Sequence, residues 1–159
     1  MTRVEVNFLG LVTVQAVHSV EEYVGRLYAV FPPARFVSGL FSQDLQRGFL
    51  IFNVGLVAFG MWCFLWPLRR HWSSASALAW LWVGIELVNG VGHPLWSLTQ
   101  RAYTPGMATA PLLLVLALML ARQLPSTALL LTLRPLSYLV QPLAPNPSLR
   151  SRHDALMVH

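Results

Sequence analysis

The residues of this sequence best suited to chemistry begin with a histidine and two glutamates in an apolar stretch. His18, Glu21 and Glu22 stand at i, i+3 and i+4, so a helix would carry all three on one face. The spacing is similar to the H-x-x-E-H zinc motif with its last histidine replaced by glutamate. His18 and Glu22 would then bind a divalent metal such as zinc. Glu21 would be the general base acting on bound water.

A second polar stripe lies in a later apolar stretch. Glu86, Asn89 and His93 are spaced by three and four residues, which again defines one helical face. We expect the two polar faces to be buried against each other at a similar depth. His93 or Glu86 would supply a third metal ligand. Two histidines and one carboxylate with an open position form a known catalytic zinc set.

The same residues also support a mechanism without metal. Burial disfavours the charged form of a carboxyl group, so Glu21, Glu22 or Glu86 could stay neutral and donate a proton. A neighbouring histidine would relay it, and Asn89 or Tyr103 would steady a developing oxyanion. The site predicts an enzyme for a lipophilic substrate that enters from the membrane. Metal-assisted hydrolysis and metal-free isomerisation or cyclisation both remain open.

The composition of the chain indicates the class of protein in which these residues are held. Of the 159 residues, 55% are hydrophobic and 11% are charged, whereas soluble domains carry about a quarter charged residues. All eleven basic residues are arginines scattered between apolar blocks, which argues against a nucleic-acid partner. The single Cys63 excludes a disulfide framework. The chain is therefore expected to be an integral membrane protein.

Four stretches are long and apolar enough to cross a bilayer, which needs about 20 residues per helix. They define an all-α bundle of four transmembrane helices within residues 1–123, with spans at about 6–30, 49–67, 74–98 and 107–123. Residues 124–145 are apolar but rich in proline and carry Arg134, which is costly in lipid. An interfacial or re-entrant segment is favoured there over a fifth span. Residues 146–159 have the composition of a disordered tail.

Arginine placement predicts the orientation of these spans. With four spans, seven arginines fall on the side of the termini (Arg3, Arg69, Arg70, Arg122, Arg134, Arg150 and Arg152) and four on the other (Arg26, Arg35, Arg47 and Arg101). Cytoplasmic loops carry the excess of basic residues. Both termini of this multi-pass protein are therefore expected in the cytoplasm.

The sequence resembles the HXXEE family of small bacterial membrane proteins over roughly residues 8–120. The resemblance rests on His18-Ser19-Val20-Glu21-Glu22, on Asn89 with His93, and on Arg101-x-Tyr103-x-Pro105-Gly106 with Thr109-Ala110. It implies a compact bundle of about four helices in the bacterial cell membrane. It also implies a polar site regarded as enzymatic and metal-dependent. It names no substrate. Ser19 departs from the polar residue usual after the motif histidine.

Two other classes of function use the same residues. Glutamate and histidine chains inside membranes relay protons, which would fit a proton-coupled transporter or channel, with oligomerisation completing the path. A polar stripe can also dock a partner helix in an assembly. The short chain, the missing internal repeat and the gathering of polar residues at one depth favour the enzyme.

Overall fold

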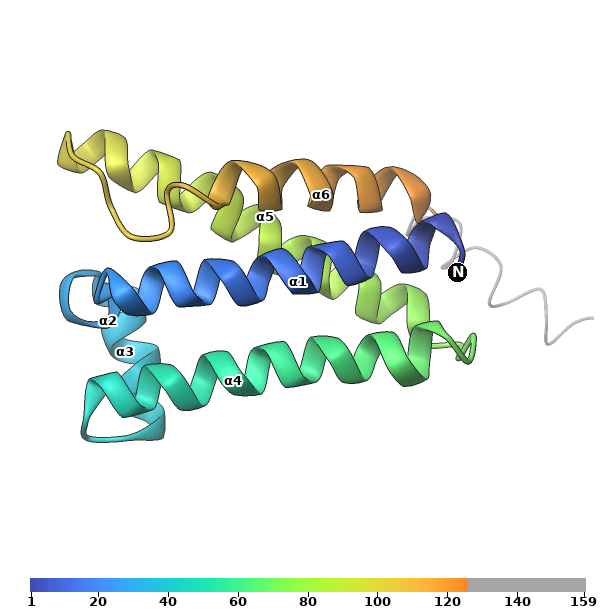
Figure 1. Cartoon of the computed structure of the whole chain (residues 1–159), viewed down its shortest axis with the longest axis horizontal. Coiled ribbons are helices and arrows are strands. Elements are labelled where there is room, and N and C mark those ends of the chain that lie inside the picture. Colours follow the sequence, from blue (N-terminus) through green and yellow to red (C-terminus); the bar gives the residue numbers. More distant parts are fainter. Residues whose placement is uncertain (126–159) are drawn as a thin grey trace, which may run out of the picture. The chain divides into compact units, whose positions relative to one another are not determined.

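The computed structural model describes residues 1–125, and every regular element within them is helical (Figure 1). The predicted all-α fold is confirmed for this part of the chain. Residues 126–159 lie outside it, and with them nearly all of the segments predicted as interfacial or re-entrant (124–145) and as a tail (146–159). The elements are α1 (Arg3–Val24), α2 (Leu27–Val30), α3 (Pro32–Phe41), α4 (Leu45–Cys63), the π-helical turn η1 (Phe64–Leu68), α5 (Ala75–Gln100) and α6 (Ala110–Gln123).

Helix α1 begins at a capping box, in which the Thr2 hydroxyl accepts from the Glu5 amide and the Glu5 carboxylate accepts from the Thr2 amide. It ends earlier than the predicted span of 6–30. Gly25 terminates the helix and Arg26 adopts a left-handed conformation with φ 55°, which turns the chain into α2. A side chain at position 25 would collide with Pro105, because a Cβ there would lie 2.5 Å from the proline Cβ.

Helix α3 has no counterpart in the sequence analysis, which leaves residues 31–48 between the first two predicted spans. Proline favours the first turn of a helix, where no amide hydrogen is needed, and here it starts α3. This helix packs on α4 so closely that Gly48 lies against the backbone of Ser38. Helix α4 starts at Leu45, four residues before the predicted span, because the Asp44 side chain caps the amides of Gln46 and Arg47.

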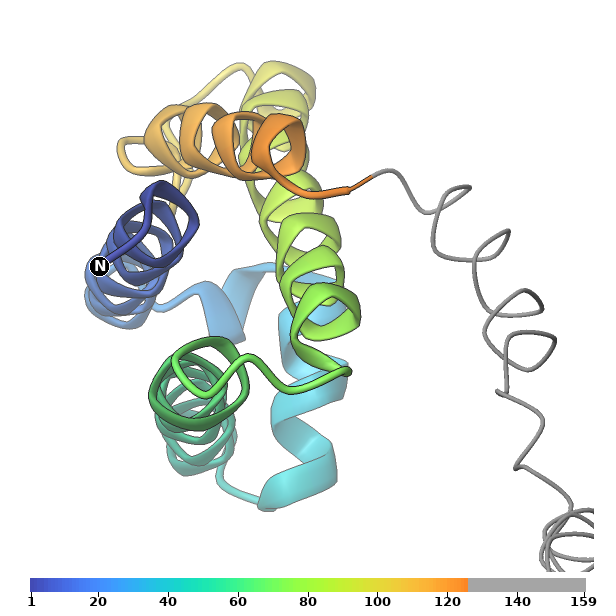
Figure 2. The ribbon, with the colours of Figure 1, turned by 90° about the vertical axis from the view of Figure 1, so that its right-hand side faces the viewer.

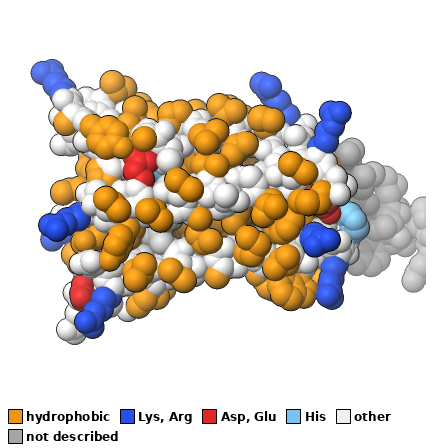
Figure 3. All heavy atoms as spheres, viewed as in Figure 1, with side chains coloured by type: hydrophobic (Ala, Val, Ile, Leu, Met, Phe, Trp, Pro, Cys, Tyr) orange, Lys and Arg blue, Asp and Glu red, His pale blue; other side chains and the backbone are white. Residues whose placement is uncertain are grey.

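Four longer helices form the body of the molecule. In Figure 2 helix α1 lies between α4 and α6, and α5 packs along α6. Helix α4 with η1 (Leu45–Leu68) and helix α5 (Ala75–Gln100) are each long and apolar enough to cross a membrane. Helix α6 is apolar but has only 14 residues. Figure 3 shows hydrophobic side chains over the visible face, with arginines gathered near both ends.

Along α1 the buried residues change from mainly apolar ones near Phe8, where Asn7 is also buried, to polar ones toward Glu22. Phe8, Leu11 and Val12 join Trp82 of α5 in the apolar core. The same face of α1 continues with Gln15, His18, Ser19 and Glu22, all of which are buried. A single helical face thus supplies both the packing that holds the bundle and the polar groups of the candidate site.

Candidate functional site

The structure brings His18, Glu22 and His93 together, and we call these three residues the His/Glu triad. Glu22 Oε1 lies 3.3 Å from His18 Nε2 and 3.0 Å from His93 Nε2. The two imidazole rings meet edge to face, with centroids 4.7 Å apart and planes at 83°. The exposed fraction is 0% for His18, 7% for Glu22 and 6% for His93. Helices α1 and α5 therefore bury three potential ligands at one point.

The triad has the dimensions of a metal site. One ligand atom from each residue can be chosen so that all three lie within 4.8 Å of one another. Tetrahedral zinc with ligand bonds of about 2.0–2.1 Å places neighbouring ligand atoms about 3.3 Å apart. The two nitrogen–oxygen distances to Glu22 are already in that range.

Glu21, the neighbour of Glu22 in sequence, has different partners. The turn between α5 and α6 wraps its carboxylate, which accepts hydrogen bonds from the amides of Gly106, Ala108 and Thr109 at 3.0–3.1 Å. The hydroxyls of Thr109 and Tyr103 donate to the same carboxylate. We call these contacts the Glu21 clamp. Because both carboxylate oxygens accept several donors, Glu21 ties α1 to the start of α6.

Thr109 links the clamp to the triad and thereby fixes the tautomer of His18. Its hydroxyl donates its single proton to Glu21 Oε2 at 2.7 Å, and His18 Nδ1 lies 2.6 Å from the same oxygen. Thr109 can only accept in that second contact, so His18 Nδ1 carries a proton. In the neutral ring, the Nε2 lone pair then points toward Glu22. In many proteins a hydrogen bond from the ring nitrogen that does not bind the metal orients a metal-binding histidine in this way.

Gly106 allows the two imidazoles to pack against the turn. Its φ of +92° is unfavourable for residues with a side chain. A Cβ there would lie 2.5 Å from Nδ1 of His93 and 2.9 Å from Cε1 of His18. The Pro105-Gly106 turn is therefore shaped both by backbone conformation and by the two histidines beneath it.

The remaining predicted site residues lie outside the triad. Glu86 is fully buried and contacts Asn89, whose Nδ2 also donates to Gln15 at 3.3 Å. Of the two residues predicted as a third metal ligand, His93 belongs to the group within residues 1–125 that could hold a metal ion, and Glu86 does not. Tyr103 is 68% exposed and donates to Glu21. That hydrogen bond to the carboxylate raises the pKa of the Tyr103 phenol.

A cavity of about 240 Å³ opens onto one side of the triad. Glu22 and His93 line it together with three amide side chains, Gln15, Asn53 and Asn89. Aliphatic and aromatic residues of α2, α3, α4 and α5 form the other walls. The triad is thus closed by the turn on one side and faces a largely apolar chamber on the other.

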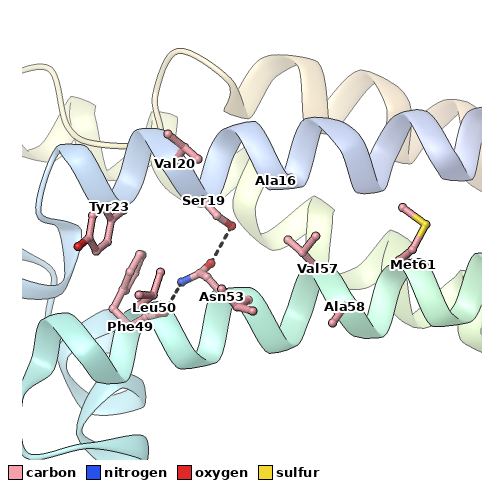
Figure 4. A pocket seen from close by; sticks show the side chains of 11 residues that line it. Ala16, Ser19, Val20, Tyr23, Phe49, Leu50, Asn53, Val57, Ala58 and Met61 are labelled. Carbon is pink, nitrogen blue, oxygen red and sulfur yellow. Dashed lines mark hydrogen bonds between the residues drawn. The ribbon is translucent and has the colours of Figure 1, made fainter.

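A larger hollow of about 500 Å³ lies between α1 and α4 (Figure 4). Its walls are apolar apart from Ser19, Asn53 and Tyr23, and no triad residue lines it. Asn53 and Phe49 line both hollows. In Figure 4 the Ser19 hydroxyl points toward Asn53, to which it donates at 2.8 Å. Of these two cavities, the smaller one is therefore the one that triad residues line.

Three residues of the site had no assigned role in the sequence analysis: Thr109, Gly106 and Gln15. The Pro-Gly pair does signal a turn that accepts positive φ. Gln15 lies one turn before Ser19 on the polar stripe, which indicates burial but not its partner. Nothing in the local sequence shows that Thr109, 91 positions along the chain, contacts His18.

The fold and the site define an α-helical protein with a buried His/Glu cluster formed between its first helix and α5. The chain belongs to the family described as "Protein of unknown function with HXXEE motif", which it matches over residues 9–121. The predicted resemblance to that family is confirmed. No curated protein and no solved structure matches the chain.

Proposed function

We propose that this protein is an integral membrane enzyme in which the His/Glu triad binds a divalent metal ion and acts on a lipophilic substrate. The observation that carries the proposal is the triad itself: three buried ligands converge within 4.8 Å, and two of them line an apolar cavity. Buried polar groups of this kind are costly unless they are paired. A substrate of low polarity fits the cavity walls.

The protonation of the triad favours a cation at its centre. Thr109 holds the proton of His18 on Nδ1, so a neutral His18 directs a lone pair toward Glu22 Oε1. His18 Nε2, 3.3 Å from Glu22 Oε1, has no aligned hydrogen-bond partner among residues 1–125. A divalent ion would bind the free Nε2 and the carboxylate at once.

Metal-assisted hydrolysis is the reaction we propose. Two histidines and one carboxylate, with a position left open, are the ligands of hydrolytic zinc enzymes. A bound zinc ion would supply Lewis acidity there. In this proposal Glu21 positions His18 through Thr109 rather than acting as the base, because its oxygens already accept from the turn. Asn89 lies on the cavity wall, where its amide nitrogen donates to Gln15 and Glu86, and we propose that it borders the substrate.

We further propose that α1 and α6 cross the membrane with α4 and α5, which gives four spans. The polar residues that lower the hydropathy of α1 face inward, while Val6, Val17, Val20 and Val24 are more than half exposed. An outward apolar face is what lipid requires. Four spans put both termini on the side with more arginines, the cytoplasm. Fusion reporters at each terminus would test the orientation.

Metal binding tests the centre directly. We expect the purified full-length protein in detergent to bind one Zn²⁺ or Co²⁺ per chain. Glu22→Gln and His93→Ala should each weaken binding by at least about 100-fold, since each removes one of three protein ligands. His71→Asn is the matched control, because His71 is exposed and its φ of 52° suits asparagine. Equal binding by Glu22→Gln and the wild type would overturn the metal centre.

Turnover tests the enzyme. The wild type and Glu22→Gln would be reconstituted in liposomes of a total membrane lipid extract, with and without Zn²⁺. We expect a product that requires both the ion and Glu22, detected by mass spectrometry of the lipids. If ion flux across the liposomes depended on Glu22 while no lipid changed, the protein would be a transporter instead.

A further inference from the structure

Glu86 is the buried ionisable group that the proposed reaction does not use. It lies on α5 with an exposed fraction of 0%. The contacts between acidic and basic side chains within residues 1–125 join Glu22 to the rings of His18 and His93, and Asp44 to Arg47. None of them involves Glu86. A carboxylate buried without a cation is strongly disfavoured, so the protonation of Glu86 must be read from its hydrogen bonds.

Glu86 stands at the end of a hydrogen-bond network, and the donors in this network can be assigned one after another from Asn53 on α4. Asn53 Nδ2 donates to the backbone oxygen of Phe49 at 3.0 Å, which turns Asn53 Oδ1 toward α1. The Ser19 hydroxyl, 2.8 Å away, must donate its single proton to that oxygen. Ser19 is left only with lone pairs for its other neighbour.

That neighbour is Gln15, and its orientation follows. Gln15 Nε2 donates to Ser19 Oγ at 3.2 Å, so the amide oxygen of Gln15 faces Glu86. This oxygen lies 2.9 Å from Glu86 Oε2 and 3.2 Å from Oε1. Two oxygens this close need a proton between them, and an amide oxygen has none to give. In this orientation of the Gln15 amide, Glu86 must carry the proton.

Exchanging the oxygen and nitrogen of the Gln15 amide removes the close contact between two oxygens but creates a conflict at Ser19. The amide would then donate to an ionised Glu86, but Ser19 would lie between two acceptors, Gln15 at 3.2 Å and Asn53 at 2.8 Å, with one proton for both. A buried charge without a cation would also remain. With Glu86 as a neutral acid, every contact in the network from the Phe49 carbonyl to Glu86 pairs one donor with one acceptor.

We propose that Glu86 is held as a neutral carboxylic acid that donates to Gln15, and that it is a positioning residue for the cavity amides. Gln15 and Asn89, which both contact Glu86, line the cavity with Glu22 and His93. This part of the inference rests on the proposed metal centre, in which Glu22 is then the one anionic ligand of the ion. The bound ion then keeps a net positive charge, which suits an anionic substrate group.

Infrared spectroscopy tests the protonation of Glu86 independently of metal. The full-length protein, with glutamate carboxyl carbons labelled by ¹³C, should show the carbonyl band of a protonated acid at neutral pH. We expect the band to disappear in Glu86→Gln and to persist in His18→Ala, which lacks a triad ligand. Absence of the band from the wild type would overturn the proposal, even if Glu86→Gln failed to fold.

Metal affinity gives a second, electrostatic readout. Replacing a neutral acid by an amide removes no charge, so Glu86→Gln should change the Co²⁺ dissociation constant by less than about threefold. Loss of a nearby negative charge would weaken binding by about tenfold or more, and that result would also overturn the neutral acid. Failure of the wild type to bind Co²⁺ would instead refute the proposed metal centre and leave the infrared test standing.

Discussion

Two adjacent carboxylates on α1 end in opposite surroundings. Glu21 accepts five hydrogen bonds from the turn between α5 and α6, whereas Glu22 meets two imidazoles and borders a cavity. The oxygens of Glu21 are largely occupied, while His18 Nε2, which faces Glu22, lacks an aligned hydrogen-bond partner among residues 1–125. A carboxylate whose hydrogen bonds are all made within the protein stabilises the fold, whereas a buried group without a partner is available to a ligand.

The two regions meet at Gly106, and we expect Gly106→Ala to have the largest effect. The methyl group would clash with both histidines and the backbone would be strained at φ +92°. Together these should lower the free energy of unfolding by about 2–4 kcal/mol and weaken Zn²⁺ binding by at least about 100-fold. Thermal unfolding in detergent and zinc titration would measure both.

Gly10→Ala is the matched control for that substitution. A Cβ at Gly10 of α1 would have nothing within 4 Å, and alanine favours a helix interior over glycine. Stability should be equal or higher by up to about 1 kcal/mol, with unchanged zinc affinity. If both alanine variants behaved alike, the close packing of Gly106 on the histidines would not matter.

Neutralising each carboxylate in turn should separate stability from binding. Glu21→Gln replaces an acceptor for five donors and should lower the free energy of unfolding by about 2 kcal/mol, a value discounted for the partial exposure of the clamp. Glu22→Gln should cost less stability while weakening metal binding by at least about 100-fold. Amide hydrogen exchange of Gly106 and Thr109 should accelerate in Glu21→Gln alone. The reverse pattern would exchange the roles of the two residues.

Intrahelical spacing predicted part of this site and could not predict the rest. The i, i+4 relation placed His18 and Glu22 on one face, because helix geometry fixes such pairs. Their meeting with His93 was an expectation about packing, and the structure brings the three together. The clamp on Glu21 was not foreseeable, since its donors are mainly backbone amides, which every residue type except proline carries.

The helix boundaries show the same limit. The apolar run continued to residue 30, so periodicity alone extended the first span past the actual end of α1 at Val24. Gly25 and the left-handed Arg26 stop it there, where Pro105 of the distant turn fills the space. Helix α3 was missed because a Pro-Pro pair ends one helix and begins another with equal ease.

Thr109 tests whether the clamp controls the triad. Thr109→Val keeps the shape but removes the hydroxyl that fixes His18, and should weaken zinc binding by about tenfold. Thr109→Ser should restore most of the affinity. Nitrogen-15 NMR of the histidines would report the loss of the Nδ1–H tautomer of His18 in the valine variant only. Equal affinity in all three proteins would contradict the coupling.

Tyr103 distinguishes a clamp residue from a catalytic one, and its effect should be the smallest. The side chain is 68% exposed and donates to Glu21 at the edge of the turn, outside the residues that line the cavity. Tyr103→Phe removes one of the five donors to the Glu21 carboxylate and leaves the other four, and water can replace the lost hydrogen bond. The expected loss is about 0.5 kcal/mol of unfolding free energy, with zinc affinity and lipid turnover unchanged. An oxyanion-stabilising role would instead leave stability intact and slow turnover by about 100-fold or more.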